Sequence, residues 1–182
     1  NYALSISATT RSPREGEVDG REYFFVSKER FQQMIEEGSL VEYAQYVNHY
    51  YGTPKEYVMR QMAQGKDVIL EIEIQGALKV KKRFPEALLL FVTPPSAEEL
   101  CRRLVGRGTE TIEVINARLR RAAEEASGME AYDYLLINDD IDRCVEEMHS
   151  LIQLQHRRTV YHLEFLNRMR EELRHLDARG QQ

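Results

Sequence analysis

Runs of apolar and β-branched residues are the feature that most restricts how this chain can fold. Residues 88–92 form an unbroken apolar run, and residues 68–74 form a second run that carries only two acids. Such runs are typical of strands that are covered on both faces, as in parallel sheets. Helical patterns alternate with these strands, so the sequence predicts an α/β fold with a mostly parallel sheet flanked by helices.

Residues 11–65 interrupt this alternation. They carry a loop, a short strand, a helix that begins after the N-cap Ser27, a strand over 40–47, a turn over 50–54 and a helix over 55–63. We therefore expect a mixed α/β lobe inserted into a core. The core is assigned to residues 1–10, 66–101 and 127–155, a helical lid to residues 102–126, and a tail to residues 156–182.

The tail has its own periodicity. Apolar residues recur at steps of three and four, at Leu163, Leu166, Met169, Leu173 and Leu176. That spacing predicts an amphipathic helix whose apolar stripe has a structural role. The stripe would pack on the body of the protein or on a second copy of the chain, so a homodimer through this helix is one prediction.

Composition excludes several classes of function. The chain has 182 residues and a formal net charge of -5, which argues against a general nucleic-acid surface. No apolar run has membrane-spanning length, so a soluble protein without membrane contact is expected. Two cysteines without framework spacing favour the reducing cytoplasm, and the five histidines show no metal-ligand spacing with them. We expect no metal bound by side chains alone.

Two arginines follow the first predicted strand, which spans residues 2–8, and could bind a phosphate. Arg11 and Arg14 flank Pro13, and a guanidinium offers a planar fork that matches phosphate oxygens. Tyr23 and Tyr51 are candidate hydroxyl donors, although tyrosines in short strands are more often packing residues. The alternative for the arginine pair is a solvated basic turn.

Four further polar residues could bind a purine base. The guanine edge presents two N–H donors side by side, and one carboxylate accepts both, which suits Glu42 with the hydroxyl of Thr53 nearby. Glu71 and Glu73 lie two residues apart in an apolar run, where acids are costly unless they are paired or bind a ligand. We expect them near the carboxyl end of that strand, where open α/β sheets bind ligands. The alternative for all three acids is an exposed strand position.

A basic segment with glycines, residues 102–109, lies at the end of a helix that is predicted over residues 97–105. It contains Arg103 and Arg107, and Arg118 lies eleven residues beyond Arg107. Arginines beside glycines can move over a phosphate and neutralise charge during its transfer, as a lid does. The alternative is a solvated helix end.

With these motifs in place, the chain closely resembles the guanylate kinase family. The matching segments follow the family's order and span about residues 3 to 155; they are residues 5–17, 19–23, 42–44, 50–53, 70–76, 94–96, 107–110 and 138–140. The resemblance implies a fold like that of the P-loop nucleoside monophosphate kinases, with an inserted GMP-binding lobe and a helical lid. It also implies ATP-dependent phosphorylation of GMP to GDP with Mg²⁺.

The resemblance assigns roles residue by residue. Arg11, Arg14, Tyr23 and Tyr51 would hold the GMP phosphate. Ser7, Glu42, Thr53, Glu71 and Glu73 would read the base or hold the nucleotide nearby, and Arg11, Arg107 and Arg118 would be catalytic. Arg103 and Arg107 would contact the ATP phosphates, and Asn138 would lie near the adenine. Where many members have aspartates, this chain has Glu71 and Glu73.

One family element is not found in the sequence. The family has a glycine-rich phosphate loop ending in Gly-Lys-Ser/Thr, and the segment 106–108 is no substitute for it. We expect about 20 to 35 further N-terminal residues that form one strand-loop-helix unit. Two other readings stay open: a non-catalytic guanylate-kinase-like module that binds phosphopeptides, and a kinase for another nucleoside monophosphate.

Overall fold

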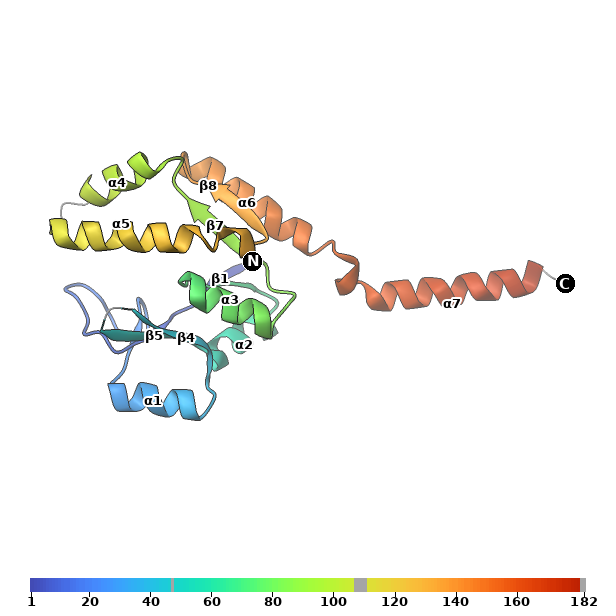
Figure 1. The fold of residues 1–182 in the computed structure, drawn as a ribbon. Coiled ribbons are helices and arrows are strands. Elements are labelled where there is room, and N and C mark those ends of the chain that lie inside the picture. Colours follow the sequence, from blue (N-terminus) through green and yellow to red (C-terminus); the bar gives the residue numbers. More distant parts are fainter. Residues whose placement is uncertain (47, 107–110, 181–182) are drawn as a thin grey trace. The chain divides into compact units, whose positions relative to one another are not determined.

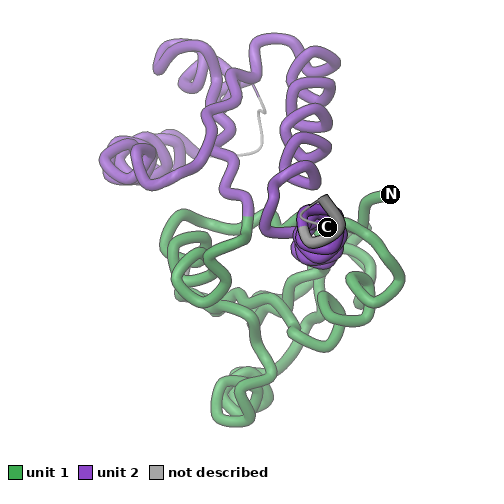
Figure 2. The backbone as a smooth tube through the Cα atoms, turned by 90° about the vertical axis from the view of Figure 1, so that its right-hand side faces the viewer, with its two compact units in different colours: residues 1–87 green, residues 88–182 purple. Residues whose placement is uncertain are grey.

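The computed structural model describes residues 1–46, 48–106 and 111–180 of the chain. The chain divides into two compact units, residues 1–87 and residues 88–182, which Figure 2 shows in different colours. Each unit is described by itself. Within the described residues, no helix combines the length and the apolar character that crossing a membrane requires.

The first unit contains a four-stranded mixed sheet and a separate parallel pair (Figure 1). The mixed sheet has the order β3-β2-β5-β4, where β2 spans Ala8–Thr9, β3 Phe24–Phe25, β4 Leu40–Tyr46 and β5 His49–Pro54. β2 is parallel to β3 and antiparallel to β5, and β4 is antiparallel to β5. The parallel pair consists of β1, Tyr2–Leu4, and β6, Asp67–Ile69. The sequence assigned residues 1–10 to the core, yet β2 pairs with strands of the inserted lobe.

The helix α1, Lys28–Glu36, packs on one face of the mixed sheet. Ser27 caps it as predicted, because its hydroxyl accepts a hydrogen bond from the Arg30 amide at 3.1 Å. Gly38 lies just past its end with φ of +63°, a conformation that glycine adopts at little cost. Phe31 and Met34 of α1 pack with Ala8 and Leu40 to form a hydrophobic core.

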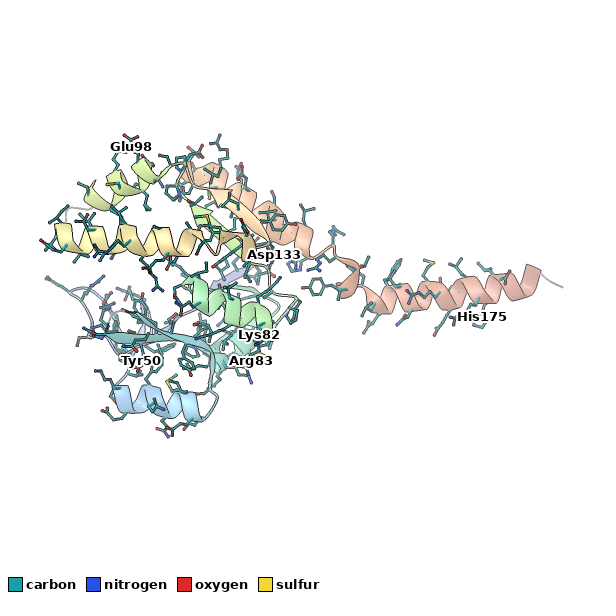
Figure 3. All side chains as sticks on the ribbon, viewed as in Figure 1. Tyr50, Lys82, Arg83, Glu98, Asp133 and His175 are labelled. Carbon is teal, nitrogen blue, oxygen red and sulfur yellow. The ribbon has the colours of Figure 1, made fainter. Side chains whose placement is uncertain are left out.

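Two more helices complete the first unit: α2, Lys55–Ala63, and α3, Ile74–Arg83. Val58 of α2 and Val80 of α3 pack against Val41 of β4 in a second core. The bounds of α2 agree with the prediction. Tyr50 lies on the α1 side of the sheet and stacks on Phe31 with ring centroids 5.5 Å apart (Figure 3).

The second unit is built on the parallel pair β7, Leu90–Thr93, and β8, Tyr134–Ile137. Its helices are α4 over Ala97–Gly106, α5 over Ile112–Ala126, α6 over Ile141–Gln155 and α7 over Leu163–Gly180, with short 3₁₀ turns at Met129–Ala131 and Thr159–Tyr161. Leu136, Leu104 and Ile115 are among its buried residues. Ser96 caps α4, because its hydroxyl accepts the Glu99 N–H, and Asp140 caps α6, because its carboxylate accepts the Arg143 N–H.

Three sequence predictions of local structure are wrong. The strand expected over residues 2–8 is two strands in different sheets, β1 and β2. The turn expected over residues 50–54 is part of β5, because pairing with β2 and β4 outweighs the local turn preference of Gly52 and Pro54. The strand expected over residues 68–74 ends at Ile69, and α3 already begins at Ile74.

Candidate functional site

Arg11 is the centre of the first cluster of predicted site residues. Its Nη1 and Nη2 donate to Glu17 Oε2 and Oε1 at 2.9 and 2.8 Å, and Nη1 also donates to the Ser12 carbonyl at 2.7 Å. The guanidinium carbon lies 5.3 Å from the ring centre of Tyr23 and 5.6 Å from that of Phe25. Carboxylate, carbonyl and two aromatic rings therefore fix the Arg11 side chain, which is only 14% exposed.

The tyrosines that the sequence assigned to this cluster lie beside the arginine. The rings of Tyr23 and Tyr51 meet edge to face with centroids 6.0 Å apart. The pKa of Arg11 is raised, first by its hydrogen bond to Glu17 and further by its interaction with Tyr51. The structure thus brings together Arg11, Tyr23 and Tyr51 as predicted, with the guanidinium over the Tyr23 ring and in contact with the Tyr51 side chain.

Glu17 organises the loop that carries the two arginines. Besides binding Arg11, its Oε2 accepts the backbone N–H of Arg14 at 2.6 Å, and its own N–H donates to the Arg14 carbonyl at 3.1 Å. The hydrogen bonds from Arg11 and then from the Arg14 amide lower the pKa of Glu17 to about 2. The Arg14 side chain is exposed, so it joins the cluster through its backbone. Sequence analysis missed Glu17, although its position in the matching segment was a signal.

Glu42 and Thr53 form the second cluster, and both are buried. Thr53, which is fully buried, donates its hydroxyl to Glu42 Oε1 at 2.7 Å. Burial raises the pKa of Glu42 above the ordinary carboxyl value, and the nearby charge of Glu73 raises it further, while the Thr53 hydrogen bond lowers it. A buried carboxylate of this kind is a strong acceptor for paired N–H donors.

An irregularity in the strand pairing explains why Glu42 is buried. The register of β4 against β5 shifts between Leu40 and Tyr43, so the alternation of a regular strand is lost. Leu40, Val41 and Glu42 are consequently all buried, with exposed fractions of 5%, 9% and 6%. The exposed strand position that was the alternative for Glu42 is wrong.

Strand β5 connects the two clusters. Tyr51 and Thr53 are two residues apart on this strand, so their side chains point to the same face, roughly 7 Å apart along the strand. Tyr50 points to the opposite face, where it packs on Phe31. The arginine cluster and the carboxylate cluster therefore share the face of the sheet that is turned away from α1.

The two acids after β6 differ in their surroundings. Glu73 is half-buried and caps α3, because its Oε1 accepts the Gly76 N–H at 3.0 Å. Its charge acts on Glu42, so it belongs to the second cluster. Glu71 is exposed and lies between β6 and α3, so the expectation that both acids share one face of a strand is wrong. Ser7 is half-buried just before β2, and its carbonyl accepts the Phe24 N–H at 2.9 Å.

The residues predicted to meet ATP belong to the second unit. Arg103 on α4 donates to Glu99 Oε1 at 2.6 Å, and the hydrogen bonds from Arg102 and Arg103 lower the pKa of Glu99 to about 2. Arg118 is half-buried on α5. Asn138 follows β8, and its N–H donates to the Thr93 carbonyl at 2.8 Å. Arg107 lies outside the described residues.

The side chains that commonly bind metal ions can be compared with what a metal ion requires. Over residues 1–46, 48–106 and 111–180, no three His, Cys, Asp or Glu side chains gather into a group that could hold one. Mg²⁺ keeps most of its waters and is bound through one or two carboxylates and the phosphates of a nucleotide. Binding of this kind does not require a group of three such side chains.

A solved structure shows the class of protein to which this fold belongs. The crystal structure of guanylate kinase from Anaplasma phagocytophilum matches with a TM-score of 0.74 and 33% identity, over 87% of this chain and 78% of that one. The α/β fold is thus that of the P-loop nucleoside monophosphate kinases, as predicted.

Sequence comparisons narrow the class to one family. A guanylate kinase family model matches residues 1–155. The guanylate kinase of Halalkalibacterium halodurans is 53% identical over 156 residues, which are 86% of this chain and 76% of that protein. That of Caldanaerobacter subterraneus subsp. tengcongensis is 51% identical over 169 residues, 93% and 82% of the two chains. The chain belongs to the guanylate kinase family, and its matched relatives are of the bacterial type.

Proposed function

We propose that this protein transfers the terminal phosphoryl group of ATP to GMP and forms GDP and ADP. An oxygen of the GMP phosphate forms the new bond to the γ-phosphorus, and the bond between that phosphorus and the β,γ-bridging oxygen breaks, so its electron pair leaves with ADP. The observation that carries the proposal is the pair of clusters on one face of the mixed sheet, with arginine at one end and a buried carboxylate at the other. That spacing suits the phosphate and the base of one purine monophosphate.

The phosphate end uses positive charge and hydroxyl groups. Arg11 would bind the GMP phosphate together with Tyr23 and Tyr51, which lie beside it, and Arg14 would approach from the same loop. Glu17 and Ser12 accept from three of the five N–H donors of Arg11, and the Tyr51 side chain also hydrogen-bonds to this guanidinium. The phosphate would approach the remaining edge, formed by Nε and Nη2, together with the Tyr51 hydroxyl.

The base end uses hydrogen-bond acceptors. The Glu42 carboxylate would accept the N1 and N2 hydrogens of guanine, and Thr53 holds that carboxylate in place. Glu73 adds negative charge beside it, while Ser7 and Glu71 would hold the nucleotide nearby. Adenine lacks this pair of donors, so the site would select GMP over AMP.

Four residues are assigned to the ATP donor. Arg103, Arg107 and Arg118 would neutralise the charge of the ATP phosphates and of the transferred group, and Asn138 would lie near the adenine. When bound, Mg²⁺ would neutralise phosphate charge. No residue has to act as a strong base, because positioning and arginine charge account for most of such a reaction.

A coupled assay tests the proposal on the full-length protein with ATP, Mg²⁺ and each of GMP, AMP, UMP and CMP. We expect GDP formation with GMP and little turnover of the other three. Turnover of another monophosphate in preference to GMP would refute the base assignment. Absence of turnover with all four, together with binding of a phosphoserine peptide, would show an interaction module instead.

Two broader predictions accompany this activity. A cytoplasmic location stays a prediction. So does a homodimer through α7, whose apolar side chains Leu163, Met169, Leu173 and Leu176 are 38–62% exposed. Light scattering of the purified protein measures its mass in solution and decides the second point.

A further inference from the structure

Gly76 lies unusually close to the carboxylate that we assign to guanine. It is a buried residue in the first turn of α3, and its N–H donates to the capping Glu73 at 3.0 Å. A Cβ atom built on Gly76 would lie 2.7 Å from Glu42 Oε2 and 3.3 Å from Glu42 Cδ. Real Cβ atoms essentially never approach another heavy atom closer than 3.0 Å, so no side chain fits here while Glu42 keeps its position.

Backbone conformation does not explain why this residue is glycine. The described glycines with positive φ are Gly16, Gly20, Gly38 and Gly65, and Gly76 is not one of them. Within a helix, alanine is favoured over glycine. The position therefore carries a residue that is poor for α3, and the contact with Glu42 is the structural feature that requires it.

The packing indicates which group would move if a methyl group were added. The α3 backbone is held by the Glu73 cap and by Val80 in the core that includes Val41 of β4. The Glu42 carboxylate, in contrast, is the end of a side chain with rotatable bonds, and one hydroxyl of Thr53 holds it at 2.7 Å. A methyl group would push this carboxylate from 2.7 Å to at least the 3.4 Å of ordinary contact and leave the fold in place.

We propose that Gly76 is a positioning residue that determines guanine selectivity, because the absence of a side chain at the start of α3 lets the Glu42 carboxylate sit where it meets the base. The proposal rests on the proposed function, in which Glu42 accepts the guanine N–H groups. It assigns to Gly76 no contact with the substrate.

The test is the variant Gly76→Ala in the coupled assay with GMP and with AMP. We expect kcat/KM for GMP to fall by about a hundredfold, since a misplacement on the order of 1 Å costs about that much. Turnover of AMP and the KM for ATP should stay unchanged, so the GMP-to-AMP ratio falls by the same factor. Lys82→Ala, an exposed change near the end of the same helix, is the control and should leave all these values unchanged.

A double-mutant cycle with Glu42→Asp isolates the contact. The aspartate is one methylene shorter and no longer reaches Gly76, so Glu42→Asp alone should weaken GMP turnover. Adding Gly76→Ala to it should then change kcat/KM less than threefold, whereas two effects that multiply would overturn the proposal. Unchanged GMP kinetics in Gly76→Ala would also overturn it.

Stability measurements keep the test decisive if Gly76→Ala folds poorly. Should the single variant unfold while the double variant folds with the activity of Glu42→Asp, the clash with Glu42 is confirmed as the cause. Should both fail to fold, Gly76 serves the fold and the proposal is refuted. Failure of the wild-type protein to phosphorylate GMP would refute the proposed function instead, which is a separate outcome.

Discussion

Replacing Thr53 with valine removes a single hydroxyl group from the buried pair with Glu42. The hydroxyl donates to the carboxylate at 2.7 Å, and both residues are buried, so solvent cannot easily replace the lost hydrogen bond. A hydrogen bond to a charged group contributes about 1.5–3 kcal/mol, and one between neutral groups about 0.5–1.5 kcal/mol. Thr53→Val should therefore lower the free energy of unfolding by more when Glu42 is ionised than when it is protonated.

The ionisation of Glu42 determines whether the destabilisation by Thr53→Val grows or shrinks as the pH rises. Burial raises the pKa of Glu42 above its ordinary value of 4.5, so ionising it costs the native state stability as the pH rises through that raised pKa. The Thr53 hydrogen bond offsets part of this cost. Hence the destabilisation caused by Thr53→Val should be about 1.5–3 kcal/mol at pH 8 and about 0.5–1.5 kcal/mol at pH 4.5, where Glu42 is mostly protonated.

Urea unfolding at the two pH values measures this difference, with Thr9→Val as the matched control. Thr9 is also fully buried, but its hydroxyl accepts the Arg11 backbone N–H at 3.1 Å and meets no titrating carboxylate. The nearby Glu17, with a pKa of about 2, stays ionised at both pH values. The control should lose the same free energy at both. An equal loss at pH 8 and pH 4.5 in Thr53→Val would refute the reasoning.

Three further changes test the two clusters by steady-state kinetics. Arg11→Ala should lower kcat/KM for GMP by about two to three orders of magnitude, because it removes the guanidinium that binds the phosphate and leaves the Glu17 carboxylate without its ion-pair partner. Near-normal kinetics in a folded variant would contradict this. Glu17→Gln removes the ion pair that fixes Arg11, so the KM for GMP should rise by about tenfold at unchanged KM for ATP; an unaltered GMP value would show that the loop holds Arg11 without it. Glu42→Gln replaces an acceptor oxygen with a donor, so the GMP-to-AMP selectivity should fall by at least about a hundredfold, and a preserved ratio would count against the base assignment.

Helix boundaries were well predicted where the local signals were complete. The bounds of α2 agree with the prediction, and the Ser27 cap of α1 is confirmed. In each case the signals, an apolar period with a cap, a glycine or a proline at the ends, lie within the helix or next to it.

Two of the predictions that failed have different physical causes. Residues 50–54 read as a turn, but β2 and β4 pair with them on both sides. The end of β6 was missed because Glu73 caps α3, and glutamate is not among the preferred N-cap residues. The first error concerns competition between a local preference and tertiary contacts, which a single sequence does not resolve. The second concerns a local cap formed by a residue type that seldom caps helices.

The sequence predicted which residues belong to the site better than it predicted how buried they are and what they contact. The pairing of Glu42 with Thr53 and the grouping of Arg11 with two tyrosines agree with the structure. Glu17 was missed although it lies in a matching segment, because the sequence does not show that Arg11 and the Arg14 amide are its partners. The burial of Glu42 likewise depends on the shifted register of β4, which has no clear sequence signal.

The ion pair between Arg11 and Glu17 has a consequence for how the protein would respond to acid. The hydrogen bonds from Arg11 and the Arg14 amide hold the pKa of the Glu17 carboxyl at about 2, and the pKa of the Arg11 guanidinium is raised above its already high ordinary value, so both groups keep their charges across the physiological pH range. Glu42, whose pKa is shifted upward, is the member of the site that changes its state as the surroundings acidify. Mild acid should thus lower the selectivity for guanine over adenine, while the charges of Arg11 and Glu17 stay the same.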